Sequence, residues 1–169
     1  DLHLSLRRQR QTCIRDRLKL GLAPGDRVGI WSHNNAEWVL LQLATAEVGL
    51  VLVNINPAYR TSELEYALNK VGCKALVSMR AFKTSRYLEM VRELAPELAT
   101  CPAGRLAARR LPLLRLVCWI DVAGQGDDEA GMLRFSDLFA QSDPEDAAVA
   151  RIAGSLDAHD PINLSLIHI

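Results

Sequence analysis

The chain has 169 residues, of which 49 % are hydrophobic and 24 % are charged, and its 20 basic residues balance its 20 acidic ones. This length suits one domain with a buried core, and the composition excludes a disordered or fibrous chain. The balanced charge provides no overall field for nucleic acid, and no run of about 18 apolar residues occurs, so we expect neither a nucleic-acid partner nor a transmembrane segment.

From residue 27 onward, short apolar segments alternate with helical patterns. We predict strands over 27–32, 50–54, 74–78 and 114–120, and helices over 34–48, 61–71 and 84–95. The strands are apolar on both faces, and helix-sized crossovers join them. This pattern predicts an α/β fold with a mainly parallel sheet and helices on both faces.

Two of the helices carry further local signals. The segment 34–48 is apolar nearly all round, which is typical of a buried helix. In the helix 61–71, Ser62 lies three residues before Glu65, as in a capping box, and Gly72 follows as a left-handed cap.

The remaining segments are predicted to be irregular. Residues 97–113, rich in Pro, Arg, Ala and Gly, indicate a long surface loop or a short helix, and the acidic stretch 121–146 indicates a turn followed by a solvated loop. Asp160 and Pro161 form a turn signal, and a further strand is predicted to begin at Ile162.

The cysteines give no sign of a metal site. Cys13, Cys73, Cys101 and Cys118 form no C-x-x-C pair and have no histidine at metal-ligand spacing. Cys73 and Cys118 lie in or beside apolar runs, where a thiol acts as a small hydrophobe. We therefore expect reduced cysteines in an intracellular setting.

Polar residues follow the first two predicted strands, at 32–35 and 54–59. In open α/β sheets, ligands bind beyond the carboxyl ends of the strands. The alternative, which we favour, is that these Ser and Asn residues end strands and cap helices. By the same reasoning His33 is a surface or capping histidine rather than a base, and Trp31 and Trp38 are core residues rather than a stacking platform.

Motifs for nucleotide binding and catalysis are missing. The sequence contains neither G-x-G-x-x-G nor G-x-x-x-x-G-K, and the pair Gly124 and Gly126 opens no helix. No Ser/His/Asp or Cys/His arrangement has a supporting spacing. We therefore assign no catalytic, cofactor-binding or metal-binding residue, and the residues alone indicate an α/β domain of unknown activity.

Several segments together nevertheless resemble a known family. They are G-L-A-P-G-D-R-V-G-I-W-S from Gly21, N-A-E-W from Asn35, N-I-N-P-A-Y-R from Asn54, E-L-E-Y from Glu63 and G-C-K-A-L-V from Gly72. They resemble the N-terminal part of adenylate-forming fatty-acyl-CoA synthetases, over residues 18–164. The resemblance implies a full-length ligase that converts a fatty acid and ATP, with Mg²⁺, to an acyl-adenylate and then to a thioester with coenzyme A.

The resemblance also implies that this chain lacks the catalytic motifs. In the family, D-P-I-N, which here begins at Asp160, precedes the phosphate loop T-S-G-T-T-G-x-P-K-G, whereas this chain continues with S-L-I-H-I, including His168. We therefore expect a partial N-terminal domain over 18–164, foreign segments at 1–17 and 165–169, no bound cofactor and no activity of its own. The matching residues Gly25, Trp38 and Pro57 are architectural. The cytoplasm is the default location.

Two other interpretations stay open. A stand-alone, non-catalytic binding or interaction module predicts a soluble monomer with a closed surface, whereas a partial ligase domain predicts an exposed apolar face. A small nucleotide-binding or redox α/β domain is disfavoured by the missing glycine loop and the missing C-x-x-C pair.

Overall fold

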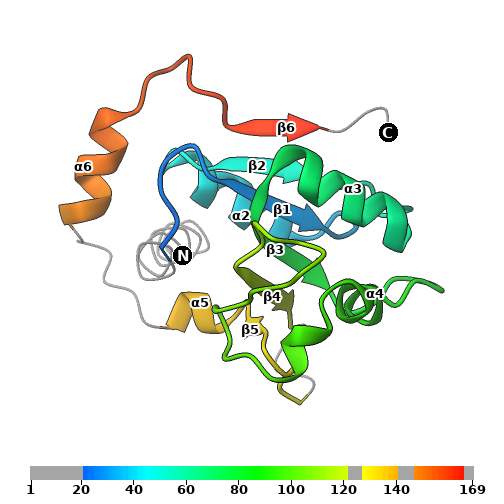
Figure 1. The fold of residues 1–169 in the computed structure, drawn as a ribbon. Coiled ribbons are helices and arrows are strands. Elements are labelled where there is room, and N and C mark those ends of the chain that lie inside the picture. The colour runs from blue at the N-terminus through cyan, green and yellow to red at the C-terminus, as the bar shows by residue number, and fades with distance from the viewer. Residues whose placement is uncertain (1–20, 122–126, 141–146, 166–169) are drawn as a thin grey trace.

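The predicted α/β architecture is confirmed. The computed structural model describes residues 21–121, 127–140 and 147–165, and it shows one parallel sheet with strand order β5-β4-β3-β1-β2-β6 (Figure 1). The strands are β1 (Arg27–Trp31), β2 (Val51–Asn54), β3 (Cys73–Met79), β4 (Leu116–Ile120), β5 (Leu133–Arg134) and β6 (Asn163–Ser165). The four strands predicted in full correspond to β1 to β4, and β6 follows the predicted turn.

Helices cover both faces of this sheet. They are α2 (Ala36–Ala46), α3 (Thr61–Val71), α4 (Tyr87–Leu94), the 3₁₀ helix η1 (Pro96–Ala99), α5 (Asp137–Ala140) and α6 (Ala147–Ser155). The helices α3 and α4 lie on one face, and α2 lies on the other (Figure 1). Parallel strands need such crossovers, because a tight turn cannot join them.

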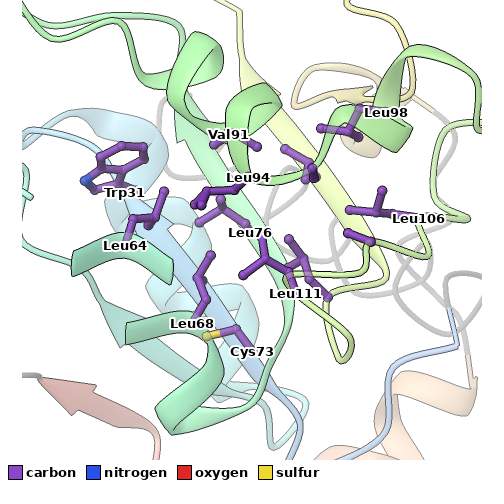
Figure 2. Close-up of a cluster of buried hydrophobic side chains, with 14 of the residues drawn as sticks. Trp31, Leu64, Leu68, Cys73, Leu76, Val91, Leu94, Leu98, Leu106 and Leu111 are labelled. Atoms are coloured by element: carbon purple, nitrogen blue, oxygen red, sulfur yellow. The ribbon is translucent and has the colours of Figure 1, made fainter. Parts of the chain in front are cut away.

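Alternate residues of the strands feed two separate cores. The first core joins the sheet to α3, α4 and the segment after η1 (Figure 2); it includes Trp31, Leu64, Leu68, Cys73, Leu76, Val91, Leu94, Leu98, Leu106 and Leu111. The second core joins the sheet to α2; it includes Val28, Ile30, Leu41, Val48, Leu52, Ala75, Val77 and Cys118. Each fully buried aliphatic or aromatic side chain contributes about 1.5–3 kcal/mol to folding.

The prediction that the helix after β1 is buried all round is wrong. Leu41 and Thr45 of α2 are buried, but Val39 is 59 % exposed and Leu43 is 46 % exposed. A helix that is apolar on every side is expected to be covered on every side. Among the described residues, α2 is covered only on the side of Leu41 and Thr45, where it packs on the sheet.

The N-cap of helix α3 lies two positions earlier than the predicted capping box implies. Its N-cap is Arg60, whose backbone N–H donates to Glu63 Oε2 at 2.9 Å. Glu65 instead accepts two hydrogen bonds from the Arg110 guanidinium, at 2.9 and 2.6 Å. The predicted cap at the other end is confirmed, since Gly72 has φ 65° and takes the left-handed conformation that glycine adopts without strain.

Two segments are partly buried, although 97–113 was predicted as a surface loop or a short helix and 121–146 as a solvated loop. Within 97–113, Leu106, Ala108 and Leu111 join the first core. In the acidic stretch, Asp121 is buried and accepts hydrogen bonds from the Ser136 N–H at 3.0 Å and from its hydroxyl at 2.5 Å.

Glu129 is also held by protein groups, since it is half-buried and pairs with Arg80 at 2.9 Å and with Arg92. Single buried residues in polar loops have no periodicity. The sequence pattern therefore missed the buried residues of 97–113 and the two held carboxylates, Asp121 and Glu129.

Candidate functional site

The two polar segments predicted as a binding edge do lie together. The strands β1 and β2 pair in parallel with Ile30 opposite Asn54, so residues 32–35 and 54–59 both leave the carboxyl edge of the sheet. This is the place where ligands bind in open α/β sheets. What the edge can do therefore depends on whether its polar groups are free.

The groups after β1 are used for capping. The Asn35 side-chain oxygen accepts from the Trp38 N–H at 2.8 Å, which makes Asn35 the N-cap of α2. The Asn35 amide donates to Ser32 Oγ at 2.8 Å, and the Ser32 hydroxyl donates to the His33 carbonyl at 2.8 Å. The capping interpretation is thus confirmed for Asn35, and Ser32 accepts a hydrogen bond from the side chain of this cap.

His33 is not a freely exposed surface residue. It is half-buried and stacks on Phe82, with ring centroids 4.4 Å apart and an interplanar angle of 20°. Its Nδ1 is buried and hydrogen-bonds to no described residue. A histidine acting as a base needs a group that orients it, and His33 has none in the described part of the chain.

Three hydrogen bonds that involve a side chain hold the segment after β2. The Trp31 indole N–H donates to the Asn56 carbonyl at 3.1 Å, and the Asn56 side-chain oxygen accepts from the Ala58 N–H at 2.9 Å. The Tyr87 hydroxyl of α4 donates to the Pro57 carbonyl at 2.9 Å, and the Tyr87 ring lies 4.3 Å from the Trp31 ring. Burial raises the pKa of Tyr87, so it remains a neutral donor.

The two tryptophans pack as predicted, in different ways. Trp31 is fully buried in the first core, and Trp38 is half-buried against the second core. Full burial leaves Trp31 no open ring face for a base or a flat ligand, and both contacts agree with the assignment of the two residues to the core.

A third polar group at this edge comes from far along the chain. Asn163 of β6 donates to Gln42 Oε1 of α2 at 2.8 Å and accepts from the Asn54 amide at 3.3 Å. Sequence reasoning missed Gln42, because a glutamine on an otherwise apolar helix has no motif that identifies its partner. The contact ties β6 to the same edge.

The described cysteines form no metal site, and two of the three are buried. Burial raises the pKa of Cys73 to about 12, so its thiol stays protonated. Cys118 is also buried, Cys101 is half-buried, and no described Cys, His, Asp or Glu residues form a group of three that could hold a metal ion. Cys13, Gly124, Gly126 and His168 lie outside the described residues.

One apolar cavity, of about 40 Å³, lies between the sheet and α2. Its walls include Val28, Leu41, Thr45 and Cys118. Pockets for small-molecule ligands measure about 300–1,000 Å³. This cavity is therefore a packing defect in the second core and not a substrate pocket.

Comparison with known proteins decides the family. Residues 14–148 match the AMP-binding enzyme family, which covers most of the chain. The chain belongs to this family. It is 41 % identical over 149 residues to the medium-chain acyl-CoA ligase ACSF2, mitochondrial, of Macaca fascicularis, and 33 % identical over 154 residues to the putative acyl-CoA synthetase YngI of Bacillus subtilis. Each match covers 87 % of this chain, but only 23 % and 26 % of the relative.

Solved structures agree on the fold of this chain. The acetoacetyl-CoA synthetase from Streptomyces lividans superposes with a TM-score of 0.65 at 27 % identity, over 82 % of this chain and 20 % of that one. An anthranilate CoA ligase in complex with anthranoyl-AMP matches with a TM-score of 0.62 at 22 % identity, over 79 % of this chain and 22 % of that one, which supports the fold alone. No helix among the described residues is long and apolar enough to cross a membrane.

Proposed function

We propose that the chain is the N-terminal part of a fatty-acid–CoA ligase. The complete enzyme would join a fatty acid to ATP, with Mg²⁺, as an acyl-adenylate and then transfer the acyl group to coenzyme A. The observation that carries this proposal is the 41 % identity over 149 residues to a protein named as a medium-chain acyl-CoA ligase. Because the chain spans about a quarter of that relative, the reaction belongs to the parent enzyme.

The role of the present residues in that enzyme is architectural. At the carboxyl edge, Asn35 caps α2 and its amide donates to Ser32. The residues around Asn56 are fixed by Trp31 and Tyr87. Stabilising the charge that develops on a reacting phosphate needs donors that are not already occupied. The described residues do not fit ATP or Mg²⁺, since they include neither a glycine-rich phosphate loop nor a group of three metal ligands.

The isolated 169-residue chain is accordingly inactive under this proposal. Exchange of labelled pyrophosphate into ATP, dependent on a fatty acid, measures adenylate formation directly. A full-length ACSF2 relative provides the positive control, with fatty acids of graded chain length. We expect exchange with the relative and none above background with this chain; fatty-acid-dependent exchange by the chain alone would refute its inactivity.

The stand-alone binding module remains the alternative. It predicts a closed surface, and the exposed side chains of Val39 and Leu43 on α2 favour the partial domain over the module. A dye that fluoresces on apolar surfaces separates the two, because the partial domain should bind it in the folded state and a closed module should not.

The domain limits and the compartment are further proposals. Residues 18–164 would form the partial domain, with foreign segments at 1–17 and 165–169. Sequencing the source DNA across the codons for Asn163 and Leu164 tests this, since a continuing frame should encode the phosphate loop. The cytoplasmic default is tested by imaging the parent protein with a fluorescent tag. The ACSF2 relatives are named mitochondrial, and a mitochondrial signal would overturn the default.

A further inference from the structure

Exposed cations gather at the amino edge of the sheet, which is the edge opposite the candidate site. This edge is formed by the start of β1, the last turn of α3, the start of β3 and the segment 104–115, which crosses the first core with Leu106 and Leu111 turned inward (Figure 2). We define the amino-edge patch as the exposed Leu113 and the four exposed cations Arg27, Lys70, Arg105 and Arg115. The patch lies at the other end of the strands from Ser165, the last described residue, which pairs opposite Asn54.

Backbone hydrogen bonds join the segment 104–115 to β3. The Arg115 N–H donates to the Lys74 carbonyl at 2.8 Å, and the Leu106 N–H donates to the Arg115 carbonyl at 2.7 Å. Arg105 directly precedes Leu106. The two arginines of the patch that this segment carries therefore lie on neighbouring stretches of backbone.

The cap of α3 joins the rest of the patch. A Cβ added at Gly72 would lie 3.3 Å from the Leu113 side chain and 3.8 Å from the Arg27 guanidinium, so both side chains lie against this cap. Lys70 is on the last turn of the same helix, close before Gly72 in the chain. Because Leu113 almost adjoins Arg115 in the sequence, the cations and the leucine form one continuous surface.

The positive charge of the patch is not neutralised within the described part of the chain, where none of its four cations forms an ion pair. Two carboxylates on the same elements have other partners, since Asp26 pairs with Lys74 at 2.7 Å and Glu65 pairs with Arg110 at 2.6 Å. Unpaired charges are costly to bury. A protein segment that covered the patch would have to bring acidic groups, so we expect the patch to face water or an anionic partner.

We propose that the amino-edge patch binds the surface of a membrane that contains anionic phospholipids. Each Lys or Arg side chain near such a surface strengthens binding about five-fold. Leu113 is 49 % exposed among the cations, and Pro112 beside it is also exposed. Apolar residues of proteins that lie on a membrane enter the boundary between headgroups and acyl chains, so these two residues have a place in the same contact.

A lipid surface uses both parts of the patch, whereas a nucleic-acid backbone offers the same negative charge without an apolar layer for Leu113. Binding of this kind needs no membrane-spanning helix, and the described residues contain none. The proposal concerns binding alone and does not depend on the ligase activity.

Flotation of the 169-residue chain with vesicles tests the proposal. Vesicles of phosphatidylcholine mixed with phosphatidylserine should carry the chain with them, and vesicles of phosphatidylcholine alone should not. Binding should weaken as salt is raised toward about 0.15 M, because added ions screen the charges. Equal binding to both kinds of vesicle, or no binding to the anionic vesicles at low salt, would overturn the proposal.

Variants of the patch locate the contact. Arg105→Gln combined with Arg115→Gln should weaken binding to the anionic vesicles by roughly 25-fold, about five-fold for each charge. Leu113→Ser should weaken it by about ten-fold at every salt concentration, because the contribution of Leu113 is apolar. The circular dichroism of both variants should match that of the parent chain, since all three side chains are exposed.

The matched control removes the same charge at the opposite edge of the sheet. Lys83→Gln combined with Arg86→Gln changes two exposed cations in the connection from β3 to α4 and should leave the affinity nearly unchanged. The basic residues of 1–19 are present in every variant, so a difference between the two pairs reports the patch. Equal losses for the two pairs would rule out the patch as the contact. Tighter binding to duplex DNA than to the anionic vesicles, lost in the patch pair, would make nucleic acid the partner and overturn the lipid assignment.

Discussion

The Tyr87 hydroxyl provides a sharp test of how the carboxyl edge is held. Tyr87→Phe removes one oxygen atom and nothing else from a fully buried ring that contacts Trp31. The lost bond, 2.9 Å long, joins α4 to the Pro57 carbonyl in the segment after β2. No other hydrogen bond between side chain and backbone links α4 to this segment among the described residues, so the substitution isolates a single link.

The expected loss follows from the partners of this bond. A neutral hydrogen bond contributes about 0.5–1.5 kcal/mol net, and an acceptor left without a partner inside the protein adds a desolvation cost. We therefore expect Tyr87→Phe to lower the free energy of unfolding by about 1–2 kcal/mol. Tyr87→Ala also removes the aromatic contact and leaves a cavity, and should cost about 3–5 kcal/mol.

Urea denaturation followed by circular dichroism measures both values. Tyr66→Phe is the control, because Tyr66 is 49 % exposed on α3 and its hydroxyl hydrogen-bonds to none of the described residues. Its midpoint should match the parent chain, and the dependence on urea concentration should be the same in all four proteins. If Tyr87→Phe were as stable as Tyr66→Phe, the Pro57 link would not hold the segment.

Three further predictions concern other parts of the fold. Gly131 has φ 69°, and an added Cβ would overlap the Leu98 carbonyl, so Gly131→Ala should lower the free energy of unfolding in urea by roughly 2–4 kcal/mol. At Gly25 φ is also positive, but no atom lies within 4 Å of an added Cβ, so Gly25→Ala should cost only about 1 kcal/mol. Equal costs for the two variants would contradict this reasoning. Burial raises the pKa of Cys73 from 9.0 to about 12, so the unfolded chain loses this proton at a lower pH than the folded chain. The stabilising effect is therefore complete below pH 9 and declines as the pH rises toward 12. The urea midpoint of Cys73→Ala should fall less steeply at alkaline pH than that of the parent chain, whereas parallel curves would argue against a buried thiol. The hydrogen bond from Arg110 lowers the pKa of Glu65, so Arg110→Met should raise it toward the ordinary value in a carboxyl NMR titration, and an unchanged titration would exclude the pair.

The fold was predictable where the sequence has periodicity. Strands β1 to β4 are short continuous apolar runs, as expected for strands buried on both faces, and helices α3 and α4 have apolar residues at the 3.6-residue spacing of a one-sided buried helix. The two-residue strand β5 is too short to show any period, and it lies in an acidic stretch whose composition is typical of a loop. The α3 N-cap was misassigned because Glu63 and Glu65 both satisfy parts of the capping pattern, and only the contact with Arg110 distinguishes them.

The candidate site was predictable in position but not in detail. The carboxyl edge follows from the parallel topology, and Asn35 acts as the cap that its residue type favours. The stacking of His33 on Phe82 and the contact of Asn163 with Gln42 join residues distant in sequence through single side chains. Such contacts depend on how distant segments of the chain are placed relative to one another, which no local sequence pattern encodes.

The return of β6 to the sheet has a consequence for the order of assembly. The strands β1, β2 and β3 occupy adjacent places in the sheet and lie within residues 27–79, so they can pair as soon as their two connecting helices form. Asn163 meets Asn54 across 109 residues, and closing so long a loop costs chain entropy before any contact compensates for it. The edge strand is therefore the last part of the sheet to join and the first to detach in local opening.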